Sequence, residues 1–426
     1  MNTTSQKETT AAYEDLAIKG KETQAQALFG GRAKPMLKGN GKKTPLKTAL
    51  MALLIVALFV VPVVLQGIHQ PMLIGAIVIV GMYTLMALGL NIVVGYAGLL
   101  DFGRIAFYAV GAYTAMIIAV PLAGVIGPVW GEWSIPFILV LAGAMAALAG
   151  YLLSLPVMRL RGDYLTIVTL GFGEIVRICL QNNIFGLTNG ALGLPRTGLR
   201  APNPPGLTWL RSNAYFSLGD SFSFSVDKGI YWCYVVLLLL LLAIVVVKRQ
   251  ENSRLGRSWA ALRDDEVAAT AMGINTTRVK TWALVLGAIW GGVAGACFAF
   301  YNIKLTPEPF NFNNSVLVLA IVVIGGMGSI PGVIVGGIML QGFPEVVRWF
   351  AQNYLGNSGI ADTVVNYRML LLGLFMIIMM AVRTEGIVPS KRMKRELRGD
   401  RGNEGNILLD GDKLTSDVTV EGGGIA

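Results

Sequence analysis

Residues 230–247 read IYWCYVVLLLLLLAIVVV, and residues 248–280 continue as KRQENSRLGRSWAALRDDEVAATAMGINTTRVK. The first part is uncharged and approaches the ~20 residues that an α-helix needs to cross a bilayer. The second part is charged, is followed at once by another apolar run, and is too long for a simple turn between two spans. The alternation predicts a helical membrane protein with a large polar loop between two of its spans.

The rest of the chain has the composition of lipid-exposed helices. Of its 426 residues, 54% are hydrophobic and only 14% are charged, whereas a soluble domain carries roughly a quarter charged residues. Between Thr48 and Met158 the only charged residues are Asp101, Arg104 and Glu132. Helices of soluble proteins need polar outer faces. The pattern therefore indicates an all-α integral membrane protein.

Apolar runs predict a polytopic bundle of about ten transmembrane segments. They lie at about residues 48–66, 72–96, 105–120, 135–156, 163–181, 230–247, 280–301, 314–329, 331–347 and 369–383. The eighth and ninth runs are short and meet in the sequence GGMGSIPG, residues 325–332. They are either two full spans with a tight turn or a broken, partly re-entrant pair.

The distribution of Lys and Arg predicts the orientation of the bundle. If the N-terminus is cytoplasmic and all ten segments cross, 27 of the 35 basic residues, Arg104 among them, lie on the cytoplasmic side. Seven lie on the other side and Arg177 lies inside a span. The positive-inside rule then places both termini and residues 248–280, the charged loop, in the cytoplasm. The net charge of +10 follows this distribution, so it indicates orientation rather than nucleic-acid binding.

Polar stretches flank the apolar part of the chain. Residues 1–45 predict a flexible cytoplasmic arm, without a cleavable signal, and residues 386–426 predict a basic and then disordered cytoplasmic tail. Residues 46–385 form the predicted transmembrane domain. Within it, residues 182–229 make the longest external, periplasmic loop, whose Gly and Pro content predicts an ordered loop or a short-helix cap.

No residue pattern predicts a catalytic or metal site. Cys179, Cys233 and Cys297 lack CxxC spacing and lie in apolar spans, where buried thiols are expected. The chain has one histidine, His69, and a single histidine cannot make a metal site. Residues 101–103 spell the kinase triplet DFG without any other kinase motif. We expect a turn at the membrane surface there, and ATP binding in a separate protein.

The charged loop contains the signals of a short helix. Asp264 is a good N-cap, the acids after it favour the positive end of a helix dipole, and Gly273 suits the left-handed position after a helix. The predicted helix has about eight residues and a length of ~12 Å, which is too short for stability in isolation. It packs either against its own membrane domain or in a groove on a separate subunit.

The same loop contains signals for two further helix starts. Asn252 or Ser253 is expected to begin a second short helix that carries Trp259 and Leu262. Asn275, with the two threonines after it, is expected to cap the following span.

Four ordered blocks of this sequence resemble one family. LRDDEVAATAMGINTTRVK, residues 262–280, contains E-V-A-A-x-x-x-G, which is similar to the E-A-A…G signature of ABC-importer permeases with one residue inserted. With it, LNIVVGYAGLLDFGRIAFYAVGAY (90–113), GDYLTIVTLGFGEIVRI (162–178) and VLVLAIVVIGGMGSIPGVIVGG (316–337) are similar to the branched-chain amino-acid permease family, LivM type. The resemblance covers about residues 45–385.

The resemblance implies a subunit of an ATP-driven importer in the bacterial inner membrane, without enzyme activity of its own. It implies a second homologous permease as heterodimer partner, two cytoplasmic ATPase subunits that bind ATP and Mg, and a periplasmic substrate-binding protein. The implied substrates are branched-chain or other hydrophobic amino acids. Urea or amides are an alternative, because urea permeases resemble this family closely. From a different class, a self-contained secondary transporter or channel is the other alternative.

By the same resemblance, part of the charged loop is the coupling helix that one ATPase holds. Its residues are Arg263, Asp264, Asp265, Glu266, Ala268, Ala269, Met272 and Gly273.

Polar and glycine residues inside the apolar runs are candidates for a translocation pathway. Glu174 and Arg177 are three residues apart on one helix face, where they can pair. Ionisable groups inside membranes usually face protein or water, so the pair either lines a pathway or fixes the bundle. Clustered glycines predict tight packing, above all at Gly291-x-x-x-Gly295.

Local helix breaks at residues 91–98 and 325–332 would expose backbone groups to a substrate. The sequences NIVVGYAG (91–98) and AIVVIGGMG (320–328) also hint at an internal repeat. The candidate pathway residues are Asn91, Gly95, Gly98, Gly171, Gly173, Glu174, Arg177, Gly325, Gly326 and Gly328.

Overall fold

A computed structural model of the full chain describes the residues of the helical bundle. The described residues are 61–62, 64–65, 71–125, 134–158, 163–184, 186–195, 216–217, 223–224, 228–302, 304–354, 367, 370, 373–374, 377 and 386–388. All of them belong to the larger of two compact units, Phe59–Ala426.

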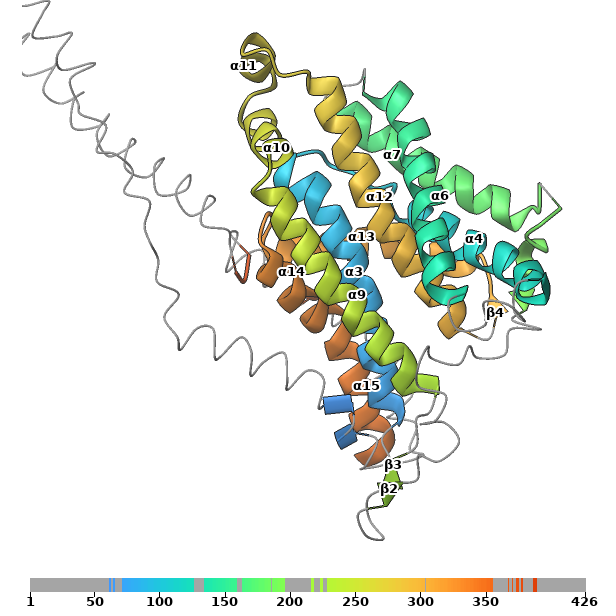
Figure 1. The fold of residues 1–426 in the computed structure, drawn as a ribbon. Helices are drawn as coiled ribbons and strands as arrows, with labels where there is room; N and C mark the ends of the chain where they lie inside the picture. Colours follow the sequence, from blue (N-terminus) through green and yellow to red (C-terminus); the bar gives the residue numbers. More distant parts are fainter. Residues whose placement is uncertain are drawn as a thin grey trace, which may run out of the picture. The chain divides into compact units, whose positions relative to one another are not determined.

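The described part of this unit is built mainly from long helices (Figure 1). They are α3 (Pro71–Asn91), α4 (Arg104–Val125), α6 (Ser134–Val157), α7 (Asp163–Gln181), α9 (Lys228–Glu251), α12 (Thr276–Tyr301), α13 (Phe312–Gly325) and α15 (Phe343–Tyr354). Shorter helices are α10 (Arg254–Asp264), α11 (Glu266–Ala271), α14 (Ile330–Gly337), the π-helical turns η1 (Ile92–Tyr96) and η4 (Ile338–Gly342), and the 3₁₀ turns η2 (Gly190–Leu192) and η3 (Glu308–Phe310). Two-residue strands are β1 (Leu194–Pro195), β2 (Phe216–Ser217), β3 (Ser223–Phe224) and β4 (Lys304–Leu305), of which β1 pairs with β4 and β2 with β3.

Six helical stretches among the described residues are long and apolar enough to cross a membrane. They are Met72–Tyr96, Ile135–Val157, Tyr164–Gln181, Gly229–Glu251, Thr276–Tyr301 and Ile330–Phe350. Two shorter apolar helices, Arg104–Ile118 and Phe312–Gly325, fall on the predicted third and eighth segments. The first and tenth predicted segments, residues 48–66 and 369–383, lie largely outside the described residues. The chain is a helical, multi-span membrane protein.

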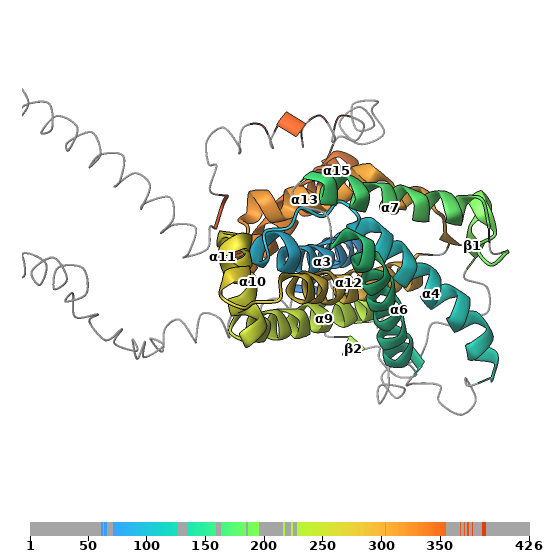
Figure 2. The same cartoon turned by 90° about the horizontal axis from the view of Figure 1, so that it is seen from above.

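Helix α12 lies at the centre of the bundle, where it packs against α3, α4 and α6 (Figure 1). Its membrane-length window is 78% buried inside the protein, compared with 17% for the window of α7. Helix α9 lies along α3, while α7 and α13 lie together on the side of α3 away from α9 (Figure 2). The bundle is therefore built around α12, and α7 forms part of its outside.

Glycines allow α12 to contact its neighbours backbone to backbone. The close helix contact predicted at Gly291 and Gly295 is confirmed, because a Cβ on Gly295 would overlap the Tyr108 carbonyl oxygen of α4. A Cβ on Gly111 of α4 would overlap the backbone of Gly292, and a Cβ on Gly292 would overlap Ala146 of α6. Small residues at helix crossings permit such close van der Waals packing in a bilayer.

Replacing Gly292 by Leu is expected to destabilise the packing of α12 against α6. A Cβ there would already lie 2.8 Å from the Ala142 carbonyl oxygen of α6, and overpacking of this kind costs about 1–3 kcal/mol. The measurement is the unfolding midpoint of the purified protein in detergent. Gly171→Ala is the matched control, because nothing lies within 4 Å of a Cβ on Gly171. An unchanged midpoint for Gly292→Leu would contradict the packing described here.

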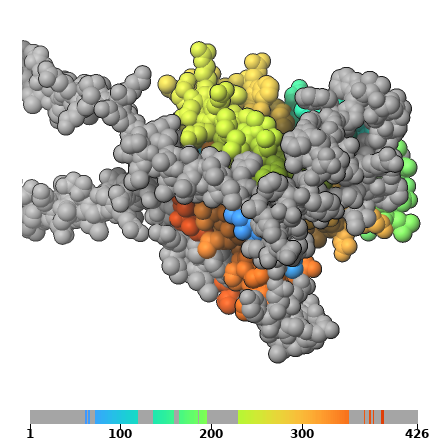
Figure 3. Space-filling view, turned by 60° about the horizontal axis from the view of Figure 1, so that its bottom comes forward, coloured from blue at the N-terminus to red at the C-terminus, as the bar shows by residue number. Residues whose placement is uncertain are grey.

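The outer face of α9 shows what the bundle presents to lipid. Leu238, Leu242 and Val245 are 61%, 49% and 45% exposed and follow the spacing of one helix face. The yellow-green surface of this region is visible in the space-filling view of Figure 3. An exposed apolar stripe without charge is typical of a lipid-facing helix.

Contacts between connecting segments follow the predicted alternation of spans. The β1–β4 pair joins Leu194 to Leu305 and so places the C-terminal ends of α7 and α12 together. At the other end of α12, the charged loop contacts the segment after α3 through Arg263 and Gly95. The predicted external pieces thus meet each other, as do the predicted cytoplasmic pieces.

The eighth and ninth predicted segments form a short helix followed by a longer one that contains a π-helical turn. Helix α13 has 14 residues, a length of about 21 Å against a hydrocarbon core of roughly 30 Å. After a reversal at residues 326–329, α14, η4 and α15 follow one another without a gap. Gly325 lies directly against Gly332 across the reversal, so glycines permit a tight return between the two helices.

Candidate functional site

Residues 97–103 connect η1 to α4 and are called the interior loop because Asp101 and Gly103 are buried, although Gly98 and Leu100 are exposed. Asp101 and Arg104 are 1% and 0% exposed, and Arg104 Nη2 lies 3.0 Å from Asp101 Oδ2. The prediction of a turn at the membrane surface is therefore wrong. So is the count of Arg104 with the cytoplasmic loops, because its guanidinium lies beside Gly287, near the middle of α12. A charge can be buried at this depth because its partner is buried with it.

The environment of Arg104 is tight and only partly polar. Its guanidinium carbon lies 5.5 Å from the centre of the Phe107 ring. The contact with Asp101 is an ion pair without hydrogen-bond alignment, and among the described residues no hydrogen-bond partner accepts from Nε, Nη1 or Nη2 of Arg104. The ion pair is therefore the main polar compensation for this buried charge.

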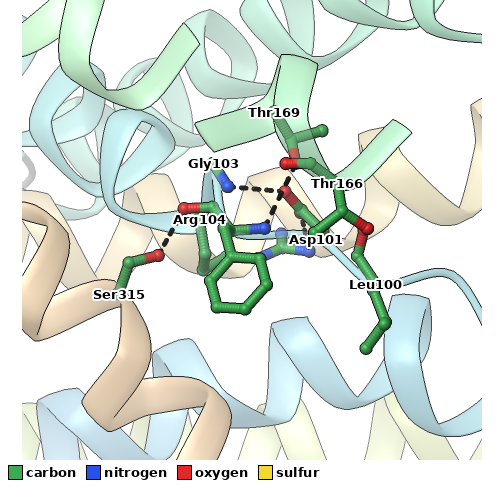
Figure 4. A network of polar contacts seen from close by, with 8 residues as sticks. Leu100, Asp101, Gly103, Arg104, Thr166, Thr169 and Ser315 are labelled. Atoms are coloured by element: carbon green, nitrogen blue, oxygen red, sulfur yellow. Dashed lines mark hydrogen bonds and ion pairs between the residues drawn. The ribbon is translucent and has the colours of Figure 1, made fainter. Parts of the chain in front are cut away.

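Hydrogen bonds from two other helices fix the interior loop (Figure 4). The Phe102 N–H donates to Thr169 Oγ1 of α7 at 3.2 Å, and the Ser315 hydroxyl of α13 donates to the Phe102 carbonyl. The Gly103 N–H donates to Asp101 Oδ1 at 2.8 Å. Glycine is needed at position 103 for space, since a Cβ would lie 2.6 Å from the Thr169 carbonyl oxygen.

The two predicted helix breaks lie in direct contact. The Gly328 N–H donates to Asn91 Oδ1 at 2.9 Å, and Gly95 packs against the Gly328 backbone so closely that a Cβ has no room. Gly98 and Gly328 both have left-handed φ angles, +70° and +75°, which glycine adopts without steric cost. These glycines are the last residues of NIVVGYAG and AIVVIGGMG. The segments with repeated sequence are therefore also paired in space.

A third segment, residues 386–388, covers the break after α13. The N–H groups of Ile387 and Val388 donate to the carbonyls of Ile324 and Gly325, at 2.8 and 3.1 Å. Carbonyls at a helix C-terminus lack partners within the helix. Ile387 and Val388 supply the hydrogen-bond donors for these two carbonyls. Sequence reasoning missed this contact, because only the short apolar GIV of residues 386–388 marks it within a polar stretch.

The charged loop folds as two short helices, and the helix boundary differs from the prediction. Helix α10 continues to Asp264, and Asp265, rather than Asp264, caps α11. Asp265 Oδ1 accepts hydrogen bonds from the N–H groups of Val267 and Ala268, at 2.7 and 3.1 Å. Helix α11 accordingly has six residues instead of eight, and Arg263 and Asp264 of the predicted coupling helix belong to α10.

The other capping predictions for this loop are confirmed. Gly273 has φ +81°, and the Ile274 and Gly273 N–H groups donate to the Ala269 and Thr270 carbonyls, which completes a Schellman motif. The side chains of Ser253 and Asn275 cap α10 and α12.

Helix α10 packs on its own membrane domain. Trp259 is fully buried and donates from Nε1 to the Val279 carbonyl at 2.9 Å, and Leu262 is buried beside it. In the last turn, Arg263 Nη1 donates to the Gly95 carbonyl at 2.7 Å. The prediction that α10 carries Trp259 and Leu262 is confirmed, and these residues hold it in place.

Helix α11 instead projects from the end of the bundle (Figure 1). Val267 and Met272 are 69% and 83% exposed, while Ala269 is buried. An ion pair between Glu266 Oε1 and Lys280 Nζ, 2.6 Å apart, ties α11 to the start of α12. The chain thus presents a short, anchored helix with apolar residues facing outward.

The candidate residues on α7 lie apart from the paired breaks. Glu174 Oε2 and Arg177 Nε are 2.7 Å apart, which confirms their predicted pairing, and each side chain is about a third exposed. Arg177 also donates to Gln181 Oε1 at 3.2 Å. Gly173 faces Gly103 of the interior loop, at 3.8 Å from an added Cβ. These residues flank the interior loop rather than the contact between Gly95 and Gly328.

The geometry agrees with a comparison against protein families. The profile described as "Branched-chain amino acid transport system / permease component" matches residues 72–380. The chain belongs to this permease family. The match includes the interior loop, both helix breaks, the charged loop and α7, whereas residues 386–388 follow the matched range.

Individual relatives of this permease carry the same description. The high-affinity branched-chain amino acid transport system permease protein LivM of Salmonella typhimurium is 40% identical over 311 residues, and that of Escherichia coli is 39% identical over 310. These matches cover 71% of this chain, and the chain spans just under two thirds (66%) of each LivM protein. The permease protein LivH of Salmonella typhimurium is 28% identical over 285 residues, 65% of this chain and 82% of that protein. No solved structure matches the chain.

Sequence reasoning identified most segments of this permease site but not how they are joined. Asp101 and Arg104 stood out as rare charges, yet nothing in their spacing showed that both are buried. Thr169 and Ser315 were missed, because an isolated hydroxyl in an apolar run carries no distinguishing pattern. The signal that points to Thr169 and Ser315 is the interior loop, because its buried backbone groups require hydrogen-bond partners.

Proposed function

We propose that this chain is a permease subunit of an ATP-driven ABC importer that moves branched-chain and other hydrophobic amino acids across the bacterial inner membrane. The observation that carries the proposal is the family match over residues 72–380, together with 40% identity to a LivM permease. One organism has two different permease proteins, LivM and LivH, that are similar to this chain. This supports a heterodimer of two homologous permeases.

The energy source is proposed to lie in two cytoplasmic ATPase subunits, which bind ATP and Mg. Helix α11, with Gly273 at its end, supplies the docking element for one of them. Its support is geometric: α11 is anchored through Glu266 and Lys280 but leaves Val267 and Met272 exposed to a partner. A periplasmic binding protein is proposed to deliver substrate from the opposite side.

The translocation pathway is proposed to pass the interior loop and the paired helix breaks. Broken helices in transporters expose backbone groups that can hydrogen-bond an ammonium or a carboxylate, and the segments around Gly95 and Gly328 are such breaks. Gly173 of α7 faces Gly103 of the interior loop, and Gly171, Glu174 and Arg177 of the same helix are proposed to line the pathway beside it. Selectivity is assigned to the binding protein, so the passage needs only weak polar contacts.

Reconstitution of the complete importer tests this proposal. The two permeases and two ATPases are placed in proteoliposomes, and uptake of radiolabelled leucine is measured with the binding protein outside. We expect uptake that requires ATP at the ATPase side and is lost with a hydrolysis-deficient ATPase. Uptake driven by an ion gradient without ATP would indicate a secondary transporter. ATP-dependent uptake of urea in place of leucine would overturn the substrate assignment.

A further inference from the structure

We propose that Arg263 is a positioning residue that passes movement of the charged loop to the paired helix breaks, an inference that rests on the proposed function. Arg263 occupies the last turn of α10, and its side chain extends from the loop to both breaks. It is therefore the contact through which a displaced α11 would change the breaks.

Arg263 contacts the backbone of the helix breaks. Its Nη1 donates to the Gly95 carbonyl at 2.7 Å. A Cβ on Gly98 would lie 2.8 Å from Arg263 Cγ, and one on Gly328 would lie 3.7 Å from Nη1. The aliphatic part and the guanidinium of Arg263 thus both contact the first break, and the guanidinium also lies near Gly328 of the second break.

The charge of Arg263 suits this position. The C-terminal end of α3 and η1 and the C-terminal end of α13 meet where Gly95 contacts Gly328. Each helix C-terminus carries partial negative charge and carbonyls without partners inside the helix. A guanidinium placed at two such ends stabilises the arrangement in which the breaks are in contact. Moving it away removes that stabilisation from both breaks together.

The connection from α11 to Arg263 is short and rigid. A single residue, Asp265, separates α10 from α11, and its side chain caps α11. Trp259 fixes the first part of α10 to the start of α12 through the Val279 carbonyl. A force on α11 therefore acts on the last turn of α10, where Arg263 lies, as well as on the start of α12 through the Glu266–Lys280 ion pair. Such a force changes the breaks only if the Arg263 contacts differ between two states of the importer.

Variants of Arg263 in the complete importer test the inference. Arg263→Ala is compared with Arg263→Lys, which keeps the charge but not the planar group with several N–H donors. Arg257→Ala is the matched control, since Arg257 lies on the same helix and is exposed. Three quantities are measured in proteoliposomes: ATPase subunits retained, ATP hydrolysed, and leucine taken up per ATP hydrolysed.

We expect Arg263→Ala to retain the ATPases and hydrolyse ATP while leucine uptake per ATP falls about tenfold or more, the size of a typical coupling between sites. Arg263→Lys is expected to lie between Ala and wild type, and Arg257→Ala to match wild type. Wild-type uptake per ATP in Arg263→Ala overturns the inference. So does loss of ATPase retention in both Arg263 variants, because Arg263 then serves docking or folding. Failure of the proposed function is a different result, because the wild-type importer would then show no ATP-dependent uptake.

Discussion

Replacing Arg104 by Met lowers the unfolding free energy of this permease by about 3–5 kcal/mol, because removal of one partner leaves a buried charge uncompensated. The remaining charge belongs to Asp101, whose side chain is fully buried beside that of Arg104. The double variant Asp101→Asn/Arg104→Met is expected to recover most of this loss. The amide oxygen of Asn can still accept the hydrogen bond that the Gly103 N–H donates to Asp101 Oδ1. The unfolding free energies of the wild type, the single variant and the double variant are measured by urea denaturation in detergent.

The pair on α7 provides the matched control for this prediction. Glu174 and Arg177 have the same three-residue spacing as Asp101 and Arg104, but their side chains are about a third exposed. Arg177→Met is therefore expected to change the unfolding free energy by only about 0–1 kcal/mol, as for other exposed pairs. Equal effects of Arg104→Met and Arg177→Met would contradict the burial of the first pair.

The variant Val267→Asp/Met272→Asp is expected to release the ATPase subunits and abolish uptake. Truncated or charged hot spots at protein interfaces cost about 2 kcal/mol or more each, which corresponds to roughly thirtyfold weaker binding per residue. Both side chains are exposed on α11, so the substitutions leave the packing of the permease intact. Co-purification of the ATPases and ATP-dependent leucine uptake are the measurements.

The conservative variant Val267→Leu/Met272→Leu is the control, because it keeps the exposed surface apolar. It is expected to retain ATPase binding and uptake. If the Asp variant binds the ATPases as wild type does, α11 is not the docking element. If the Leu variant also loses binding, the site depends on shape at these positions rather than on their apolar character.

The sequence predicts the helical membrane class, because long apolar runs without charge have no other stable structure. It also predicts the glycine contacts of α12 and the termination of α11 at Gly273, since both follow from local spacing. The predicted N-cap of α11, Asp264, lies one residue before the observed cap, Asp265. Asp264 and Asp265 are both capable caps, and the choice follows from where α10 ends, which depends on the packing of Trp259 and Leu262.

The features that sequence reasoning missed are long-range ones. Charge counting predicts that Arg104 lies in a loop, because it treats a charge between two apolar runs as solvent-exposed. Its burial requires Asp101, the Phe107 ring and the space left by Gly287 of α12. The contact of Arg263 with Gly95 joins residues 168 positions apart, and no local pattern encodes it. The repeated glycine sequences gave the best indication that the two breaks belong together.

The hydrogen bonds of residues 386–388 to Ile324 and Gly325 have a consequence for biosynthesis. The ribosome makes α13 and the reversal after it some sixty residues before it reaches Val388. Until then, these two carbonyls lack the partners they have in the finished protein. The second helix break is therefore completed only after the last apolar run has been translated, while every contact between the interior loop and α7 is already available. The two breaks therefore gain their hydrogen-bond partners in a fixed order. The break that contains Asn91 comes first, and the break that contains Gly328 comes last.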